Sequence, residues 1–140
     1  MKYLLDSNVL SEPTKKRPDS KVLQWLAGHR FDCAVSILAL GEVERGIMKL
    51  PAGNRRHRLM SWFNNMADEM EQEGRVISMD SRLMSFWGPV YNREEKLTKR
   101  KPPFVDTVMA AMAEMHGLVM VTRNVRDFPA SLPTINPWEA

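Results

Sequence analysis

Short apolar runs alternate with longer stretches of helical periodicity along this chain, and this alternation constrains its fold more than any other feature. Each apolar run has the length of a buried strand, and the stretches between them are long enough for helices. The predicted strands cover residues 3–5, 31–35, 75–79, 118–121 and 132–135. The predicted helices cover residues 18–28, 36–50, 52–73, 80–99 and 104–116. This alternation predicts a parallel sheet of about five strands between two helical layers, that is, a three-layer α/β/α domain.

The length and composition of the chain fit one such domain over residues 1–140. A hydrophobic fraction of 44% and a charged fraction of 26% are usual for a globular fold. The single cysteine, Cys33, excludes an intrachain disulfide and cannot by itself form a zinc site. No apolar run approaches the ~20 residues of a membrane span, and Asp6 interrupts the opening run too early for a leader peptide. We therefore expect a cytoplasmic protein without a membrane partner.

Four acidic residues occupy comparable places relative to these elements. Asp6 closes the first predicted strand, and Glu42 lies in the helix that follows the second. Asp106 falls in the first turn of the helix after a double proline, and Asp127 follows the fourth strand. In a doubly wound sheet such places meet at the carboxyl edge of the strands, where ligands bind. We therefore expect three or four carboxyl groups to share one crevice.

Carboxylates that are brought together repel one another unless a proton or a cation neutralises them. Ligands that offer only oxygen select hard ions such as Mg²⁺ or Mn²⁺, and a metal held in this way can activate water beside a phosphoryl group. The net charge of +3 allows a nucleic-acid partner without implying one. Basic clusters at residues 15–17, 55–58 and 96–101 would carry a polyanion to the acidic crevice, although each alone also suits a solvated surface.

Residue patterns alone leave two assignments open. An Asp in a first helical turn is favoured by the helix dipole whatever its function, so Asp106 can be a structural residue. In the helix over residues 36–50, Glu42 lies opposite the apolar stripe, and Glu44 lies nearer to that stripe. Periodicity therefore does not select Glu42 as a site residue. The predicted stripe consists of Ile37, Leu40, Val43 and Ile47.

Five segments follow one another in an order and spacing that are typical of a known family. They are Leu4-Leu5-Asp6-Ser7-Asn8, Gly41-Glu42-Val43-Glu44-Arg45-Gly46, Pro103-Phe104-Val105-Asp106, the stretch 121–128 and Asn136-Pro137-Trp138. Each segment is weak evidence alone, but the ordered set spans the chain and is specific. In this set the chain resembles the PIN-domain family, and within it the VapC-type ribonuclease toxins of bacterial toxin–antitoxin pairs.

The resemblance implies a Mg²⁺-dependent endoribonuclease, with Mn²⁺ as an alternative ion, that is inhibited by a cognate antitoxin. It also implies a homodimer that reaches operator DNA only through the antitoxin. By this resemblance Asp6, Asp106 and Glu42 hold the metal, which favours Glu42 over Glu44. Asn124 and Asp127 complete the catalytic set. Position 124 is often Asp in the family, so the amide here puts a second metal in doubt.

Two other functions fit the same residues less well. The first is a PIN-fold binding module with an idle site, which would act through complexes of antitoxin and operator DNA. The second is a phosphatase with a phospho-aspartate intermediate. Asn8 stands where that mechanism places a second Asp, two residues after the nucleophile Asp6, so the phosphatase is the weakest of the three readings.

Overall fold

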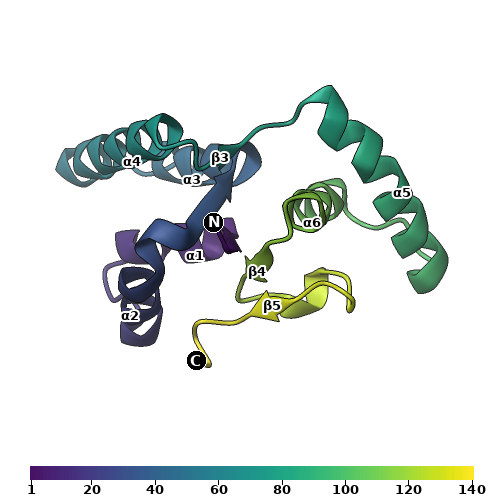
Figure 1. Ribbon diagram of the computed structural model, residues 1–140. Helices are drawn as coiled ribbons and strands as arrows, with labels where there is room; N and C mark the ends of the chain where they lie inside the picture. The colour runs from purple at the N-terminus through teal and green to yellow at the C-terminus, as the bar shows by residue number, and fades with distance from the viewer.

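A computed structural model describes residues 1–140 and contains a parallel sheet of five strands (Figure 1). Along the sheet the order is β3-β2-β1-β4-β5, and every neighbouring pair is parallel. The strands are β1 (Tyr3–Leu5), β2 (Cys33–Ser36), β3 (Val76–Ile77), β4 (Val119–Val121) and β5 (Thr134–Ile135). The predicted α/β fold with about five parallel strands is therefore confirmed.

Six α-helices connect and cover these strands. They are α1 (Ser7–Ser11), α2 (Ser20–His29), α3 (Ile37–Met48), α4 (Asn54–Gln72), α5 (Ser81–Thr98) and α6 (Phe104–His116). Three short 3-10 helices cover Glu12–Thr14, Arg30–Asp32 and Val125–Asp127. No helix combines the length and the apolar character that a membrane crossing requires.

Side-chain caps stabilise the first turns of α1, α3 and α5. Asp6, Ser36 and Asp80 each accept a backbone N–H of the helix that follows, at 2.8, 3.0 and 2.8 Å. At the other end of α6, Gly117 adopts a left-handed φ of 64°, which glycine adopts without the steric cost of a side chain.

Four of the five strands are shorter than predicted. Strand β4 begins at Val119 instead of residue 118, and β5 begins at Thr134 instead of residue 132. The segment before β2 turns into the 3-10 helix Arg30–Asp32, so this strand begins at Cys33 instead of residue 31. Only Val35 and Ser36 of β2 pair with β3, because Ser36 already caps α3 and ends its own strand. The third strand is therefore limited to two residues, where the apolar run predicts five.

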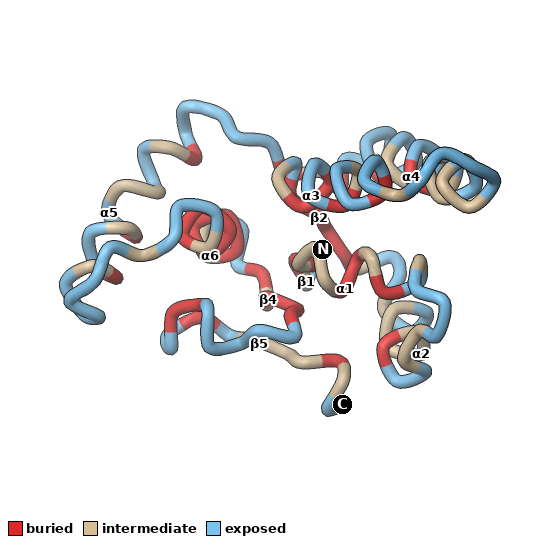
Figure 2. The backbone as a smooth tube through the Cα atoms, turned by 180° about the vertical axis from the view of Figure 1, so that it is seen from behind, coloured by how far each residue is buried: buried red, intermediate tan, exposed pale blue.

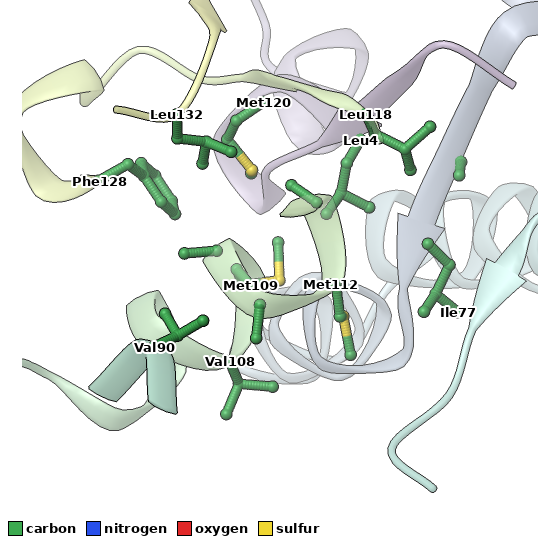
Figure 3. Close-up of a cluster of buried hydrophobic side chains, with 14 of the residues drawn as sticks. Leu4, Ile77, Val90, Val108, Met109, Met112, Leu118, Met120, Phe128 and Leu132 are labelled. Carbon is green, nitrogen blue, oxygen red and sulfur yellow. The ribbon is translucent and has the colours of Figure 1, made fainter. Parts of the chain in front are cut away.

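Alternate residues of β1 face opposite helical layers. Leu4 packs into a cluster with α5 and α6, whereas Leu5 packs into a second cluster with residues of α1 to α4. Figure 3 shows the first cluster, in which Met109 and Met112 of α6 lie near Leu4 and Met120 of the sheet. The sheet thus has a hydrophobic core on each face, as a three-layer fold requires.

Helix α6 is deeply buried over its middle two turns. All residues from 107 to 113 are buried, including the alanines at 110 and 113, and Figure 2 shows this helix as largely buried. The alanines allow the helix to approach its neighbours closely. Val105, in the first turn of this helix, is 38% exposed and lines the acidic crevice described next.

Candidate active site

The candidate site lies where the strand order of the sheet reverses. Strand β1 has β2 on one side and β4 on the other, so the connections leave it in opposite directions and open a crevice at its carboxyl end. Asp6 directly follows β1, and Thr122 directly follows β4. The backbone N–H of Asp6 donates to the carbonyl oxygen of Val121 at 2.9 Å, which joins the two strand ends.

A hydrogen-bond network holds the carboxyl group of Asp6. The buried Thr122 donates its hydroxyl to Oδ2 at 2.8 Å, and the backbone N–H of Ser7 donates to Oδ1 at 2.8 Å. The side-chain amide of Asn8 lies 3.5 Å from Oδ2. The same threonine hydroxyl accepts the backbone N–H of Asn124 at 3.0 Å, so the loop after β4 is tied to the same acid. Asp6 therefore both caps α1 and presents an oriented carboxyl group to the crevice.

Glu42 reaches this crevice from α3. Its Oε2 accepts a hydrogen bond of 2.8 Å from the hydroxyl of Ser7, the residue next to Asp6. Glu44 instead lines a separate groove between α3 and α4, beside Phe63. The geometry thus brings Glu42, and not Glu44, to Asp6, as the family resemblance implies.

All five predicted site residues line one cavity of about 500 Å³ at the end of the sheet. They are Asp6, Glu42, Asp106, Asn124 and Asp127. The N-cap of α6 is Pro103, so Asp106 does not cap its helix. Asp127 ends the 3-10 helix Val125–Asp127, is exposed, and lines the same cavity.

Burial and mutual repulsion raise the pKa of two of these acids. Burial is the main cause at Asp106, and the charges of Asp127, Asp6 and Glu42 add to it, which brings the pKa to about 6. Burial also raises the pKa of Asp6, against the hydrogen bonds from Thr122 and Ser7, while Glu42 and Asp127 raise it further. The carboxyl groups are thus close enough to oppose one another's ionisation.

Comparison with known proteins decides the family. The model of the PIN domain matches residues 3–130. The chain belongs to the PIN-domain family. It is 31% identical over 140 residues to the VapC ribonuclease Y4jK of Sinorhizobium fredii, with 97% of each chain covered. It is 27% identical over 143 residues to the toxin FitB of Neisseria gonorrhoeae, with 96% of this chain and 97% of FitB covered.

Among solved structures, a complex of FitAB bound to the DNA fragment IR36 shares the fold of this PIN domain. The match has a TM-score of 0.86 and 25% identity, and covers 97% of this chain and 95% of the other. The family resemblance that the five sequence segments carry is thereby confirmed. The chain is a PIN-domain homologue of VapC-type ribonuclease toxins, and this relationship supports a nuclease.

The donor set of this PIN domain fits a hard divalent cation. Every acidic group in the cavity offers oxygen, and their mutual repulsion is the condition that a cation relieves. No three side chains of His, Cys, Asp or Glu are close enough to form a ready-made metal cage. An open set of this kind suits Mg²⁺, which usually keeps several of its waters.

Sequence patterns did not single out one cation of the cavity. Arg55 lies in the first turn of α4, lines the cavity and donates to the carbonyl oxygen of Thr14 at 3.4 Å. Its basic cluster is visible in the sequence, but the packing that brings α4 against the 3-10 helix Glu12–Thr14 is not. Lys15, from another basic cluster, pairs with the buried Glu12 at 2.9 Å and so has a structural contact.

Proposed function

We propose that this protein is a metal-dependent endoribonuclease and the toxin of a toxin–antitoxin pair, with residues 1–140 forming its single nuclease domain. The observation that carries the proposal is the convergence of Asp6, Glu42, Asp106 and Asp127 on one cavity at the switch point of the sheet. The likeness to a VapC ribonuclease supports RNA as the substrate. The likeness to the toxin FitB supports the biological role.

Asp6, Asp106 and Glu42 would hold Mg²⁺, with Mn²⁺ as the alternative ion. Such an ion supplies a water of lowered pKa and stabilises charge on the phosphoryl group. Thr122 and Ser7 keep the carboxyl groups of Asp6 and Glu42 oriented through their hydroxyl hydrogen bonds. Water attack at phosphorus breaks the bond to the 3′ oxygen and leaves 3′-hydroxyl and 5′-phosphate ends.

Two polar residues at the rim complete the proposed catalytic set. Asn124 offers an amide that orients a water or a phosphate oxygen without adding charge, and its backbone is fixed by Thr122. The exposed carboxylate of Asp127 would accept a hydrogen bond from the attacking water, since it lines the same cavity. Because position 124 is an amide, we propose one firmly bound metal.

The proposed partners are a cognate antitoxin and, through it, operator DNA. This chain shares its fold, over nearly its whole length, with a chain in the structure of FitAB bound to a DNA fragment. A homodimer of the toxin belongs to the same proposal. The antitoxin, the operator DNA and the homodimer are proposed from the family relationship. The lining of the cavity supports only the catalytic role.

Cleavage of RNA by the purified protein with Mg²⁺ tests the proposal. Asp6→Asn and Asp106→Asn should each lower the cleavage rate by about 100-fold or more, as loss of a preorganised electrostatic group does. Asp68→Asn, an exposed change on α4 outside the cavity, should retain the rate. Circular dichroism should show that all variants are folded. Equal cleavage by the wild type and both site variants would refute the assignment.

The idle binding module remains the second candidate, and the same experiment separates it. The retained carboxyl groups oppose this reading, because a site without a cation has no use for acids that repel one another. A wild type that cuts no RNA, and whose stability does not respond to Mg²⁺, would favour the idle module.

A further inference from the structure

A second hollow adjoins the acid site. Its volume is about 350 Å³, and it lies between the end of α5, the start of α6 and the 3-10 helix Val125–Asp127. Asp106 and Asp127 line both this hollow and the acidic cavity. The two spaces therefore meet at these two residues, and a chain that crosses the acid site can continue into the second hollow.

Three cations of the second hollow have no acidic partner. Arg100, Lys101 and Arg126 line it, and none of the ion pairs of the protein involves them. The remaining acid of the hollow, Glu94, is already paired with Arg93 at 3.2 Å. The positive charge on this side of the site is thus free to meet an anion.

The backbone that presents these cations is well fixed. Lys99 ends α5 with a left-handed φ of 59°, and the Thr98 hydroxyl donates to the carbonyl of Glu94 at 2.8 Å. The same hydroxyl lies 3.3 Å from the carbonyl oxygen of Arg100. Pro102 and Pro103 then restrict the chain up to α6. A subsite of this kind is largely formed before its ligand arrives, which lowers the entropic cost of binding.

The lining of the hollow indicates the class of ligand. Eight of its twelve lining residues are charged or polar, and the other four are three prolines and Phe128. The groove between α2 and α4 is the opposite case, because Leu26, Trp62 and Met66 line it. Free cations in a polar hollow next to a nuclease site suit the phosphate of a nucleic-acid strand.

We propose that Arg100, Lys101 and Arg126 bind a backbone phosphate of the RNA strand beyond the scissile bond. The strand then crosses the acid site over Asp106 and Asp127, with Arg55 on the far side. This proposal rests on the proposed ribonuclease function and adds to it a subsite that favours strands over mono- and dinucleotides.

Binding of labelled single-stranded RNA in an Asp6→Asn background with Mg²⁺ tests the subsite without requiring cleavage. The triple change Arg100→Gln, Lys101→Gln and Arg126→Gln should raise the Kd for a 12-nucleotide RNA by about 10-fold or more. The slope of log Kd against log salt should fall by about 0.7 for each phosphate contact that is lost. The gain in affinity from a trinucleotide to the 12-nucleotide RNA should shrink in the triple variant.

A matched control removes the same charge elsewhere. The control is the triple change Lys2→Gln, Lys21→Gln and Arg82→Gln. All three residues are exposed, form no ion pair, and line neither the acid site nor the second hollow. This control should change the Kd by less than about 2-fold, because only the general attraction of the surface is altered. Arg126→Gln alone should give a smaller rise in Kd. This single variant replaces the triple variant in the test if the triple variant does not fold.

Equal Kd values and salt slopes for the two triple variants would overturn the subsite. Cleavage by the wild-type protein is measured separately, so the two proposals can fail independently. If the wild type does not cut RNA but the Kd still depends on the three cations, the subsite holds and the ribonuclease assignment fails.

Discussion

Burial and three neighbouring acids act together on the carboxyl group of Asp106. Its pKa of about 6 compares with an ordinary value of 3.8, so the metal-free folded protein binds a proton more tightly than the unfolded chain does. The group therefore favours folding when it is protonated. That advantage is complete below about pH 4 and is lost as the pH rises through 6.

Asp106→Asn should consequently stabilise the metal-free protein at neutral pH. With EDTA at pH 7.5 we expect a gain of about 1 kcal/mol in the free energy of unfolding, since solvent screening reduces the full effect of the pKa shift. At pH 4 the wild type and the variant should differ little. Urea denaturation at the two pH values measures this. A wild type that is as stable as the variant at pH 7.5 would show that ionisation of Asp106 does not destabilise the fold.

Helix α3 shows what an element can and cannot reveal from its sequence. Its start at the Ser36 cap and the burial of Leu40, Val43 and Ile47 follow from residue patterns, and all are observed. Ile37, predicted on the apolar stripe, is 43% exposed, and Ala39 is buried in its place.

The face of this helix that lines the cavity could not be read from its periodicity. Glu42 is exposed and lies away from the core, which is also the pattern of an ordinary surface glutamate. What distinguishes it is the hydroxyl of Ser7, 35 positions away in the chain. The family resemblance favours Glu42 as a metal ligand, and the structure shows that Glu42 lines the cavity. A family pattern contains information on tertiary contacts that the periodicity of one helix does not.

Glu42→Gln and Glu44→Gln form a matched pair on this helix. Both changes remove one charge and keep the shape, but only Glu42 lines the acid cavity. We expect Glu42→Gln to lower the cleavage rate or raise the Mg²⁺ concentration for half-maximal activity by about 10-fold or more. Glu44→Gln should behave like the wild type in a Mg²⁺ titration of RNA cleavage. Loss of activity in Glu44→Gln alone would contradict the geometry.

The other features that the sequence does not predict are contacts between elements that lie far apart in the chain. Local patterns predict the five strands and the five longer helices, because caps, apolar runs and glycines act within a few residues, but they miss the short α1 and overestimate most strand lengths. They do not reveal that Arg55 of α4 reaches the cavity, or that Lys15 pairs with the buried Glu12. Those facts depend on how the elements pack, and packing follows from the whole set of apolar faces.

At the scale of the whole molecule, the sheet order concentrates the acids. Residues from the ends of β1 and β4, from α3 and from α6 meet at one edge, while the two hydrophobic cores lie on the faces of the sheet. Core packing thus holds together carboxyl groups that repel one another. The folded state carries this repulsion and the unfolded chain does not, so a cation that binds the site must stabilise the fold.

Mg²⁺ should therefore raise the melting temperature of the wild-type protein. At about 100 times the Kd, binding to the folded state adds about 2.7 kcal/mol. For a chain of this size that corresponds to a rise of about 8 °C, since each kcal/mol shifts the Tm by about 3 °C. Asp106→Asn should abolish most of the rise, whereas Asp68→Asn outside the cavity should keep it. Differential scanning calorimetry with and without Mg²⁺ measures the shift, and equal shifts in both variants would place the ion elsewhere on the surface.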